Sequence, residues 1–276
     1  MTIRSKRERY EPYQGDQEPL FTIDVMTLFP DMIDTAMQTS VIGRAAAKGI
    51  IRVRATDIRD YGMGKNRRTD DYPYGGGKGL VMMAEPLFRC HEAITGGEHV
   101  HTVLMSAQGR PFTQEVAREL LAKGRFVIVC GHYEGVDQRF IDECVDEEIC
   151  LGSFVLTGGE IPAMAVADCV CRMVPGVLSE EVCFTEESHW NGLLEYPQYT
   201  RPEEWRGRRV PQVLLSGNHK DVHRWQRIQA IMRTLLRRPR LLERANMSPE
   251  EQAIYAEVQR DLMRGKDEIA GTEIVK

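Results

Sequence analysis

The chain has 276 residues, of which 42% are hydrophobic and 28% are charged, as in folded globular proteins rather than disordered ones. No apolar run approaches the roughly 18 to 20 residues that span a bilayer, and the first twenty residues lack the apolar core of a secretory signal, so we expect a cytoplasmic protein. Seven cysteines without a CxxC pair argue against a disulfide framework and favour buried, reduced thiols.

Residues 1–20 differ from the rest of the chain because they are polar, charged and poor in apolar side chains. We expect them to form a flexible extension. From residue 21 onwards, apolar or alternating stretches that predict strands alternate with stretches of helical spacing. The expected strands are 21–29, 51–58, 100–105, 125–130 and 147–157, and the expected helices are 31–49 with Asp31 as N-cap, 113–124, 136–145 and 160–174. This order predicts an α/β domain over 21–177, with a parallel sheet covered on both faces.

One segment of this region, residues 59–79, has no regular pattern and is rich in Gly, Arg, Asp and Tyr. Its length favours a functional loop over an idle connection. Its GGGKG sequence is not a P-loop, because Lys78 is followed by Gly79 instead of Ser or Thr. Two interpretations stay open: a mobile surface loop, or a cradle for RNA phosphate or base that is assisted by Arg67, Arg68 and Lys78.

The remainder of the chain predicts a second, helical domain. Residues 178–200 show no periodicity and predict a linker, and the domain itself is expected over 201–276. Apolar spacing near 3.6 predicts a helix over 219–238. Ser248-Pro249-Glu250-Glu251 is a capping box, which predicts a last helix running to about residue 264.

Charge is unevenly distributed between these parts. Residues 201–244 contain twelve Lys or Arg and four Asp or Glu, a local balance of +8 in a chain of net charge −5, so the remainder carries −13. A local basic segment in an acidic protein is typical of a surface that binds phosphates. We expect Arg201, Arg208 and Arg209 to contact RNA there, and a solvated helix face is the alternative.

Three glycine-containing loops follow expected strands: SAQG at 106–109, GHYEG at 131–135 and LTGGEIP at 156–162. Ligands of open α/β sheets bind at the carboxyl ends of the strands. Glycine at such an end lets a ligand approach the backbone, and apolar neighbours can enclose an aromatic base. Together the three loops predict one nucleotide-like ligand.

These loops also carry a resemblance to a known family. The blocks SAQGRPF, CGHYEGVDQR, LTGGEIPAM, PGVL, LLEYPQYTRP and VPQVLLSGNH, in this order and spacing, closely resemble the bacterial tRNA (guanine-N1)-methyltransferases of the SPOUT superfamily. The resemblance runs from about Phe21 to about Leu242. The GHYEGVDQR block and the stretch from YTRP to SGNH are its most specific parts.

The resemblance implies a SPOUT-type α/β fold whose C-terminal part is tied in a deep trefoil knot, a rare exception to the rule that chains are unknotted. It implies a homodimer with active sites between the subunits and a helical domain that grips the tRNA. It also implies a pocket for the methyl donor S-adenosylmethionine. By position, the pocket comprises Leu104, Met105, Ser106, Gln108, Gly109, Gly131, Tyr133, Glu134, Gly135, Leu151, Gly152, Leu156, Gly158, Gly159 and Pro162.

The implied reaction moves a methyl group to N1 of the guanine on the 3′ side of the anticodon. This nitrogen must lose its proton, so the reaction needs a base, and a positive group would stabilise charge that develops on O6. The family's base is an Asp in the linker, and the matching residue here is Glu187, with Glu186 as its rival. Arg172 matches a family arginine and is the expected positive group. Mg²⁺ is a candidate cofactor, but no metal ligands are predicted.

Three other functions are less consistent with these motifs. A related knotted methyltransferase with a different RNA target is disfavoured by the YTRP-to-SGNH block. A non-catalytic RNA-binding homologue is disfavoured by the intact glycine loops, although Glu187 in place of the family's Asp leaves this alternative open. A thiol redox protein would rest on Cys169 and Cys171 alone.

Overall fold

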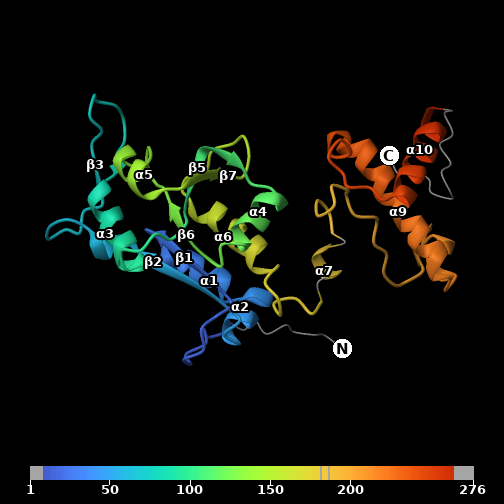
Figure 1. Cartoon of the computed structure of the whole chain (residues 1–276), viewed down its shortest axis with the longest axis horizontal. Coiled ribbons are helices and arrows are strands. Elements are labelled where there is room, and N and C mark those ends of the chain that lie inside the picture. Colours follow the sequence, from blue (N-terminus) through green and yellow to red (C-terminus); the bar gives the residue numbers. More distant parts are fainter. Residues whose placement is uncertain (1–8, 181, 186, 264–276) are drawn as a thin grey trace. The chain divides into compact units, whose positions relative to one another are not determined.

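The computed structural model describes residues 9–180, 182–185 and 187–263. The chain divides into two compact units, Met1–Glu181 and Val182–Lys276 (Figure 1). None of the helices in the described ranges is long and apolar enough to cross a membrane.

The first unit is built on a five-stranded sheet in which all strands are parallel, in the order β2-β1-β6-β5-β7. The strands are β1 (Phe21–Thr27), β2 (Ile51–Asp57), β5 (Thr102–Pro111), β6 (Arg125–Cys130) and β7 (Glu147–Cys150). The central strands β1 and β6 are buried almost throughout, as their runs of apolar residues require. The expected α/β fold with a parallel sheet is therefore confirmed.

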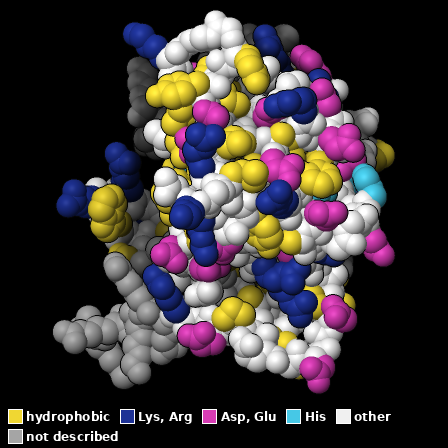
Figure 2. All heavy atoms as spheres, turned by 90° about the vertical axis from the view of Figure 1, so that its left-hand side faces the viewer, with side chains coloured by type: hydrophobic (Ala, Val, Ile, Leu, Met, Phe, Trp, Pro, Cys, Tyr) yellow, Lys and Arg dark blue, Asp and Glu magenta, His cyan; other side chains and the backbone are white. Residues whose placement is uncertain are grey.

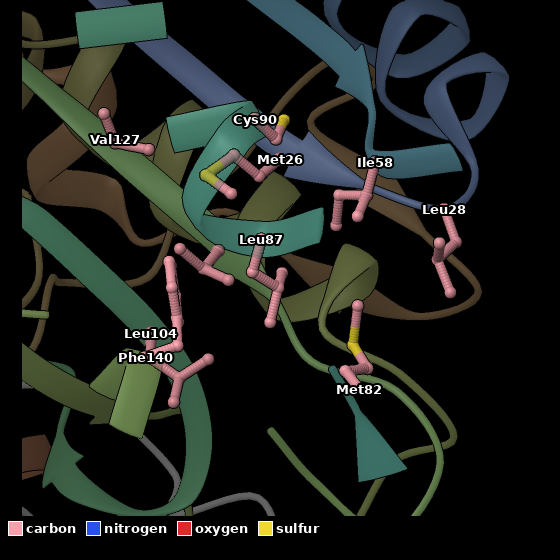
Figure 3. Close-up of a cluster of buried hydrophobic side chains, with 10 residues drawn as sticks. Met26, Leu28, Ile58, Met82, Leu87, Cys90, Leu104, Val127 and Phe140 are labelled. Atoms are coloured by element: carbon pink, nitrogen blue, oxygen red, sulfur yellow. The ribbon is translucent and has the colours of Figure 1, made fainter. Parts of the chain in front are cut away.

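Helices cover both faces of this sheet (Figure 1). Contacts with the strands and with one another group α1 (Pro30–Met37), α4 (Gln114–Leu121) and α6 (Glu160–Cys171) on one face, and α3 (Ala84–Thr95) and α5 (Gln138–Cys144) on the other. Figure 3 shows the core on the α3 side, where Met26 and Val127 of the sheet meet Leu87 of α3 and Phe140 of α5. Because side chains alternate along a strand, neighbouring residues of β1 and β6 fill the other face.

The single helix expected over 31–49 is wrong, because the chain forms α1 and then α2 (Ser40–Ala47). Thr39 is extended and interrupts the helix. The turn is tight: a Cβ on Gly43 would lie 2.3 Å from the backbone carbon of Gln38. Asp31 is not the N-cap either. Pro30 occupies the first helical turn, so Phe29 takes the cap position and Asp31 lies inside the helix.

Other expected boundaries also change. The strand expected to end at residue 105 continues through the SAQG segment, with a register shift between Met105 and Arg110. The strand expected over 147–157 ends at Cys150, since residues 151–156 leave the sheet edge and expose Phe154 and Val155. Helix α3 was not predicted. The 59–79 loop is irregular apart from η1 (Ile58–Tyr61) and the two-residue β3 (Asp70–Asp71), which pairs with β4 (Val81–Met82).

Residues 9–20, expected to be flexible, lie against the first unit in the structure. The Tyr10 and Tyr13 amides donate to the carbonyls of Gln38 and Ala46, and the Leu20 amide donates to that of Ile50. A Cβ on Gly49 would lie 2.9 Å from the Tyr13 ring, so the ring packs directly on that glycine. The segment thus crosses the ends of α1 and α2 next to the edge strand β2.

The second unit has its own apolar core between α9 (His219–Arg237) and α10 (Pro249–Met263), in which Ile231, Ile254 and Val258 are buried. The expected capping box is confirmed: the Glu251 amide donates to Ser248 Oγ at 3.3 Å, and the Ser248 amide donates to Glu251 Oε2 at 2.7 Å. The remaining elements are short: α7 (Val182–Thr185), β8 (Glu204–Trp205), β9 (Arg208–Arg209), α8 (Gln212–Leu215) and η2 (Pro239–Leu241).

The second unit begins before residue 201, where we expected the helical domain to start. Leu193 is buried in the α9–α10 core, and the Leu194 amide donates to Thr234 Oγ1 at 2.8 Å. Leu193 and the Leu194 amide therefore attach this stretch to the second unit. Because the stretch around them forms no helix or strand, sequence periodicity could not predict this attachment.

Candidate active site

A cavity of about 320 Å³ lies where the three glycine-containing segments meet, at the bulge of β5 and the carboxyl ends of β6 and β7. The bulge of β5 contributes Ser106 and Gln108, and the loop after β6 contributes Gly131 to Gly135. The third wall is the stretch from Leu151 through Gly159 to the start of α6. The sheet topology thus brings together three segments that are far apart in the sequence.

Most of the residues expected in the donor pocket line this cavity. They are Leu104, Met105, Ser106, Gln108, Gly131, Tyr133, Glu134, Gly135, Leu151, Leu156, Gly158, Gly159 and Pro162. Gly109 and Gly152 do not line it. A Cβ on Gly109 would lie 2.4 Å from the backbone of β7, and one on Gly152 would lie 2.9 Å from the Phe154 ring. Gly109 therefore allows close packing of β5 on β7, and Gly152 allows close packing against the Phe154 ring.

Several lining residues were not predicted. Ala107, His132 and Thr157 lie inside the quoted motifs, so a reading of whole loops would have found them. Gln138 and Ile141 enter from α5; Gln138 lies inside the quoted CGHYEGVDQR block, whereas nothing in the sequence context of Ile141 marks it.

The glycines of the cavity have different roles. A Cβ on Gly131 would meet only side-chain and carbonyl atoms at 3.5 Å or more, so the position has room beside the cavity. Gly135 has φ +150°, a conformation that side chains avoid, and a Cβ there would meet nothing within 4 Å. By contrast, a Cβ on Gly159 would lie 2.6 Å from Cys130 Cα. Gly159 lets the chain pass close to the end of β6.

A buried hydrogen-bond chain supports the wall formed by His132. Glu160, the first residue of α6, is 2% exposed. Its Oε1 accepts a hydrogen bond of 2.6 Å from Thr27 Oγ1, and its Oε2 lies 2.6 Å from His132 Nε2. The His132 ring centroid lies 5.1 Å from that of Phe29 and 6.2 Å from that of Tyr133. The ends of β1, β6 and the start of α6 are therefore fixed to one another beside the cavity.

A second hollow, of about 430 Å³, adjoins the first at Tyr133. Its lining comes from the 59–79 loop and includes the expected Arg67 and Arg68, together with Arg59 and Lys65, which were not predicted. Burial, followed by the negative charge of Asp70 and its hydrogen bond to the ring hydroxyl, raises the pKa of Tyr133. The Tyr133–Asp70 bond therefore ties the GHYEG loop to the 59–79 loop.

The basic side chains of the 59–79 loop do not form a surface of one sign. Arg67 pairs with Asp60 at 2.7 Å and Arg68 pairs with Asp71 at 3.0 Å, while Lys78 is exposed and outside both hollows. On the face that Figure 2 shows, lysine and arginine side chains are likewise interspersed with acidic ones. An anionic ligand would have to compete with these carboxylates.

The expected catalytic groups are not among the residues that line this cavity. Arg172 follows the last residue of α6, whereas Gly158, Gly159 and Pro162 of the cavity lie at the helix start. The helix has twelve residues, so its ends are about 18 Å apart. Glu187 is half-buried in the second unit. Its rival Glu186 lies outside the described residues.

The expected RNA-binding residues of the second unit gather around one hairpin. β8 and β9 are joined by a turn in which Arg206 and Gly207 both have positive φ. Arg201, Arg208 and Arg209 are exposed, and Arg209 Nε donates to Glu204 Oε2 at 2.8 Å. The Arg206 guanidinium lies 4.9 Å from the centre of the exposed Trp205 ring. Exposed guanidinium groups and an exposed aromatic ring are therefore combined on this hairpin.

The described residues offer no candidate for a metal-centred or disulfide chemistry. Among them, no three His, Cys, Asp or Glu side chains are grouped to hold a metal ion, and the six cysteines whose side chains are described form no disulfide bond. Burial raises the pKa of the Cys171 thiol to about 12, and that of Cys130 well above its ordinary value. Thiols of this kind are structural instead of reactive.

The sequence of this chain is similar to the sequences of known proteins of one family. A family model described as tRNA (Guanine-1)-methyltransferase TrmD matches residues 21–244. Relatives named tRNA (guanine-N(1)-)-methyltransferase include a Ruminiclostridium cellulolyticum protein, 50% identical over 80% of this chain and 96% of its own length. Another, from Moorella thermoacetica, is 49% identical over 86% of this chain and 96% of its own. The chain therefore belongs to the tRNA (guanine-N1)-methyltransferase family.

Proposed function

We propose that this protein transfers a methyl group from S-adenosylmethionine to N1 of the guanine on the 3′ side of the tRNA anticodon, in the cytoplasm. The observation that carries the proposal is the cavity at the bulge of β5 and the carboxyl ends of β6 and β7, lined by the segments through which the chain resembles this family. Two relatives, 50% and 49% identical to this chain, are named tRNA (guanine-N(1)-)-methyltransferase, which supports this activity.

The cavity fits a donor of this kind. A nucleoside needs close approach to backbone, which Gly131 and Gly135 allow because a Cβ at either position would project into uncrowded space. Apolar Leu104, Leu156 and Pro162 can enclose the base, and Ser106 and Gln108 offer polar partners. When bound, the sulfonium donor supplies an already activated methyl group, so the protein itself must supply alignment and proton removal.

In the proposed mechanism, Glu187 accepts the proton from guanine N1, and Arg172 stabilises the negative charge that develops on O6. A carboxylate in water is a weak base for this proton, so the half-buried Glu187 must act through its position and through a closed, dry site. No step is assigned to Mg²⁺, because the described residues contain no cluster of carboxylates or histidines that fits a metal ion.

We propose that the active unit is a homodimer in which Arg172 and Glu187 of one subunit act on the guanine held at the donor cavity of the other. The length of α6 supports this arrangement, because it separates Arg172 from its own cavity by about 18 Å. Apolar side chains are also left exposed around the cavity: Phe29 is 43% exposed, Val155 83% and Ile161 49%. Exposed apolar clusters of this kind are typical of subunit interfaces.

Two further parts of the proposal concern the chain's path and its RNA contacts. We propose that the chain is knotted, since the segment before α6 passes against the end of β6, where the Gly159 amide donates to the Gly131 carbonyl at 2.9 Å.

We propose that a helical tRNA-binding domain follows the donor domain, contacting phosphates through Arg201, Arg208 and Arg209 and assisted by Arg67, Arg68 and Lys78 of the 59–79 loop.

The decisive experiment is a methyl-transfer assay with two tRNA transcripts that differ only in guanine or adenine after the anticodon. We expect transfer to the guanine transcript alone, with the methyl group recovered at N1 of that guanine. Equal transfer to both transcripts would favour a related methyltransferase with another RNA target. Binding of both transcripts without any transfer would favour a non-catalytic homologue.

A further inference from the structure

The buried carboxylate of Glu160 has no part in the mechanism above, yet it lies directly behind the wall of the donor cavity. A carboxylate that is 2% exposed is costly unless its oxygens are hydrogen-bonded. Here both are: Thr27 Oγ1 and His132 Nε2 each lie 2.6 Å away, on different oxygens. His132 also lines the cavity, so Glu160 reaches the cavity through one imidazole ring.

The Thr27 hydroxyl determines the direction of the hydrogen bonds from Thr27 through Glu160 to His132. The Phe29 amide donates to Thr27 Oγ1 at 2.9 Å, which leaves the Thr27 hydroxyl hydrogen to donate to Glu160. An ionised carboxylate only accepts hydrogen bonds. His132 must therefore carry a hydrogen on Nε2. Its other ring nitrogen, Nδ1, has no hydrogen-bond partner within the described ranges and is not among their buried unpartnered atoms.

The surroundings hold the ring in this orientation. A Cβ on Gly158 would lie 2.3 Å from His132 Cε1 and 2.7 Å from Glu160 Oε2, so only glycine leaves space for the contact. The rings of Phe29 and Tyr133 restrict the imidazole from two further directions. A carboxylate that fixes the tautomer of a histidine is a known way of orienting the free nitrogen toward a substrate.

We propose that Glu160 is a positioning residue of the donor site: it holds His132 as the Nε2–H tautomer and leaves Nδ1 as an acceptor for an N–H or O–H group of the bound nucleoside. The inference rests on the proposed function for the identity of that nucleoside. It adds a specificity element, because an acceptor at this position favours ligands that present a hydrogen-bond donor there.

The tautomer can be measured without any ligand. In the chain labelled with ¹⁵N-histidine, the His132 signals are identified by their loss in His132→Gln. At alkaline pH, where the ring is neutral, we expect a protonated Nε2 and an unprotonated Nδ1. We expect Glu160→Gln to give a mixture of both tautomers, because the amide can donate as well as accept. An Nδ1–H tautomer in the wild type, or an unchanged tautomer in Glu160→Gln, overturns the proposal.

Calorimetry with S-adenosylmethionine tests the consequence for binding. We expect Glu160→Gln and His132→Gln each to weaken binding about tenfold, roughly the effect of one hydrogen bond. His132→Gln gives a second measurement in case Glu160→Gln does not fold. Glu147→Gln is the matched control: Glu147 Oε1 lies 2.8 Å from His101 Nε2, away from the cavity, so donor affinity should not change.

The two proposals fail in different ways. A wild-type chain that binds no S-adenosylmethionine overturns the proposed function and the ligand contact of His132 together. Normal binding by the wild type, with the same affinity in the folded His132→Gln and Glu160→Gln variants, overturns only the role of Glu160.

Discussion

Single glycines decide whether the donor cavity can be tested by substitution. Gly131 and Gly159 both line it, but their surroundings differ. The nearest atoms to a Cβ on Gly131 belong to side chains that can adjust, whereas a Cβ on Gly159 would overlap backbone atoms of Cys130 and Gly131. Loss of activity in a Gly159 variant would therefore report on folding as much as on the ligand.

We expect Gly131→Val to weaken S-adenosylmethionine binding while the protein stays folded. The side chain enters the cavity, and overpacking of this kind costs about 1 to 3 kcal/mol, which corresponds to roughly 5- to 150-fold in affinity. Calorimetry gives the affinity, and thermal denaturation monitored by circular dichroism gives the folding control. Gly131→Ala, with one methyl group, should have a smaller effect. Unaltered affinity in folded Gly131→Val would mean that the donor binds elsewhere.

At the scale of elements, periodicity and capping signals allowed much of the fold to be predicted. Strand 125–130 agrees with β6, and helix 219–238 agrees with α9 to within one residue, because each has a strong apolar pattern of its own. The capping box before α10 was predicted because its hydrogen bonds are local. The parallel sheet followed from the alternation of strands and helices.

The errors came where tertiary contacts override local pattern. The apolar stretch over 151–156 resembles a strand, but it leaves the sheet edge and its side chains are exposed. Helix α3 was not predicted; its Pro86 lies in the first helical turn, where proline is tolerated. Ile141 could not be linked to the site from sequence, because only the packing of α5 brings it to the cavity wall, and the hydrogen bond between Glu160 and His132 likewise appears only in the fold.

The start of α10 gives a pH-dependent prediction. Burial alone would raise the pKa of Glu251, but the Ser248 amide and the Arg227 guanidinium outweigh it and hold the pKa below its ordinary value. A carboxyl group with a depressed pKa stabilises the fold above its unfolded pKa, and this contribution is lost as the pH falls through the folded pKa. The cap should therefore stabilise the second unit at neutral pH and weaken in acid.

We expect Glu251→Gln to lower the free energy of unfolding by about 1 to 3 kcal/mol at neutral pH, because both the cap and the ion pair are weakened. Denaturant titrations at neutral and acidic pH give the measurement, and the difference from wild type should shrink in acid. Glu250→Gln is the matched control, since Glu250 is exposed in the same turn. A difference that persists undiminished in acid would assign the effect to something other than the carboxylate charge.

At the scale of the whole molecule, the shared active site can be tested by mixing two inactive chains. Glu187→Gln removes the proposed base and Gly131→Val blocks the donor cavity. If sites are shared, each heterodimer has one intact site and one doubly damaged site. Equal mixing with free subunit exchange should then restore roughly a quarter of the wild-type rate.

Two results would contradict this arrangement. Exchanging, folded subunits that stay inactive would mean that each chain uses its own base and donor. Full activity of Glu187→Gln alone would assign the base to another residue, with Glu186 the first to test.

The basic hairpin of the second unit predicts strong salt dependence of tRNA binding. Each phosphate contact should contribute a slope of about −0.7 to −0.9 in log K against log salt. Charge reversal at Arg201, Arg208 and Arg209 should reduce that slope and weaken tRNA binding, while S-adenosylmethionine binding stays unchanged. Lys123→Glu, at an exposed position of the first unit, is the control. Affinity that hardly responds to salt would rule out a phosphate footprint.

The presence of two separate apolar cores has a consequence for how this protein would fail under stress. One core is built on the five-stranded sheet and the other on α9 and α10, and each belongs to its own compact unit. Heating should therefore melt the chain in two steps, and a single melting temperature would describe neither. A heat-labile substitution at Ile231 or Ile254 would abolish capture of the tRNA at a temperature where the sheet still retains the methyl donor.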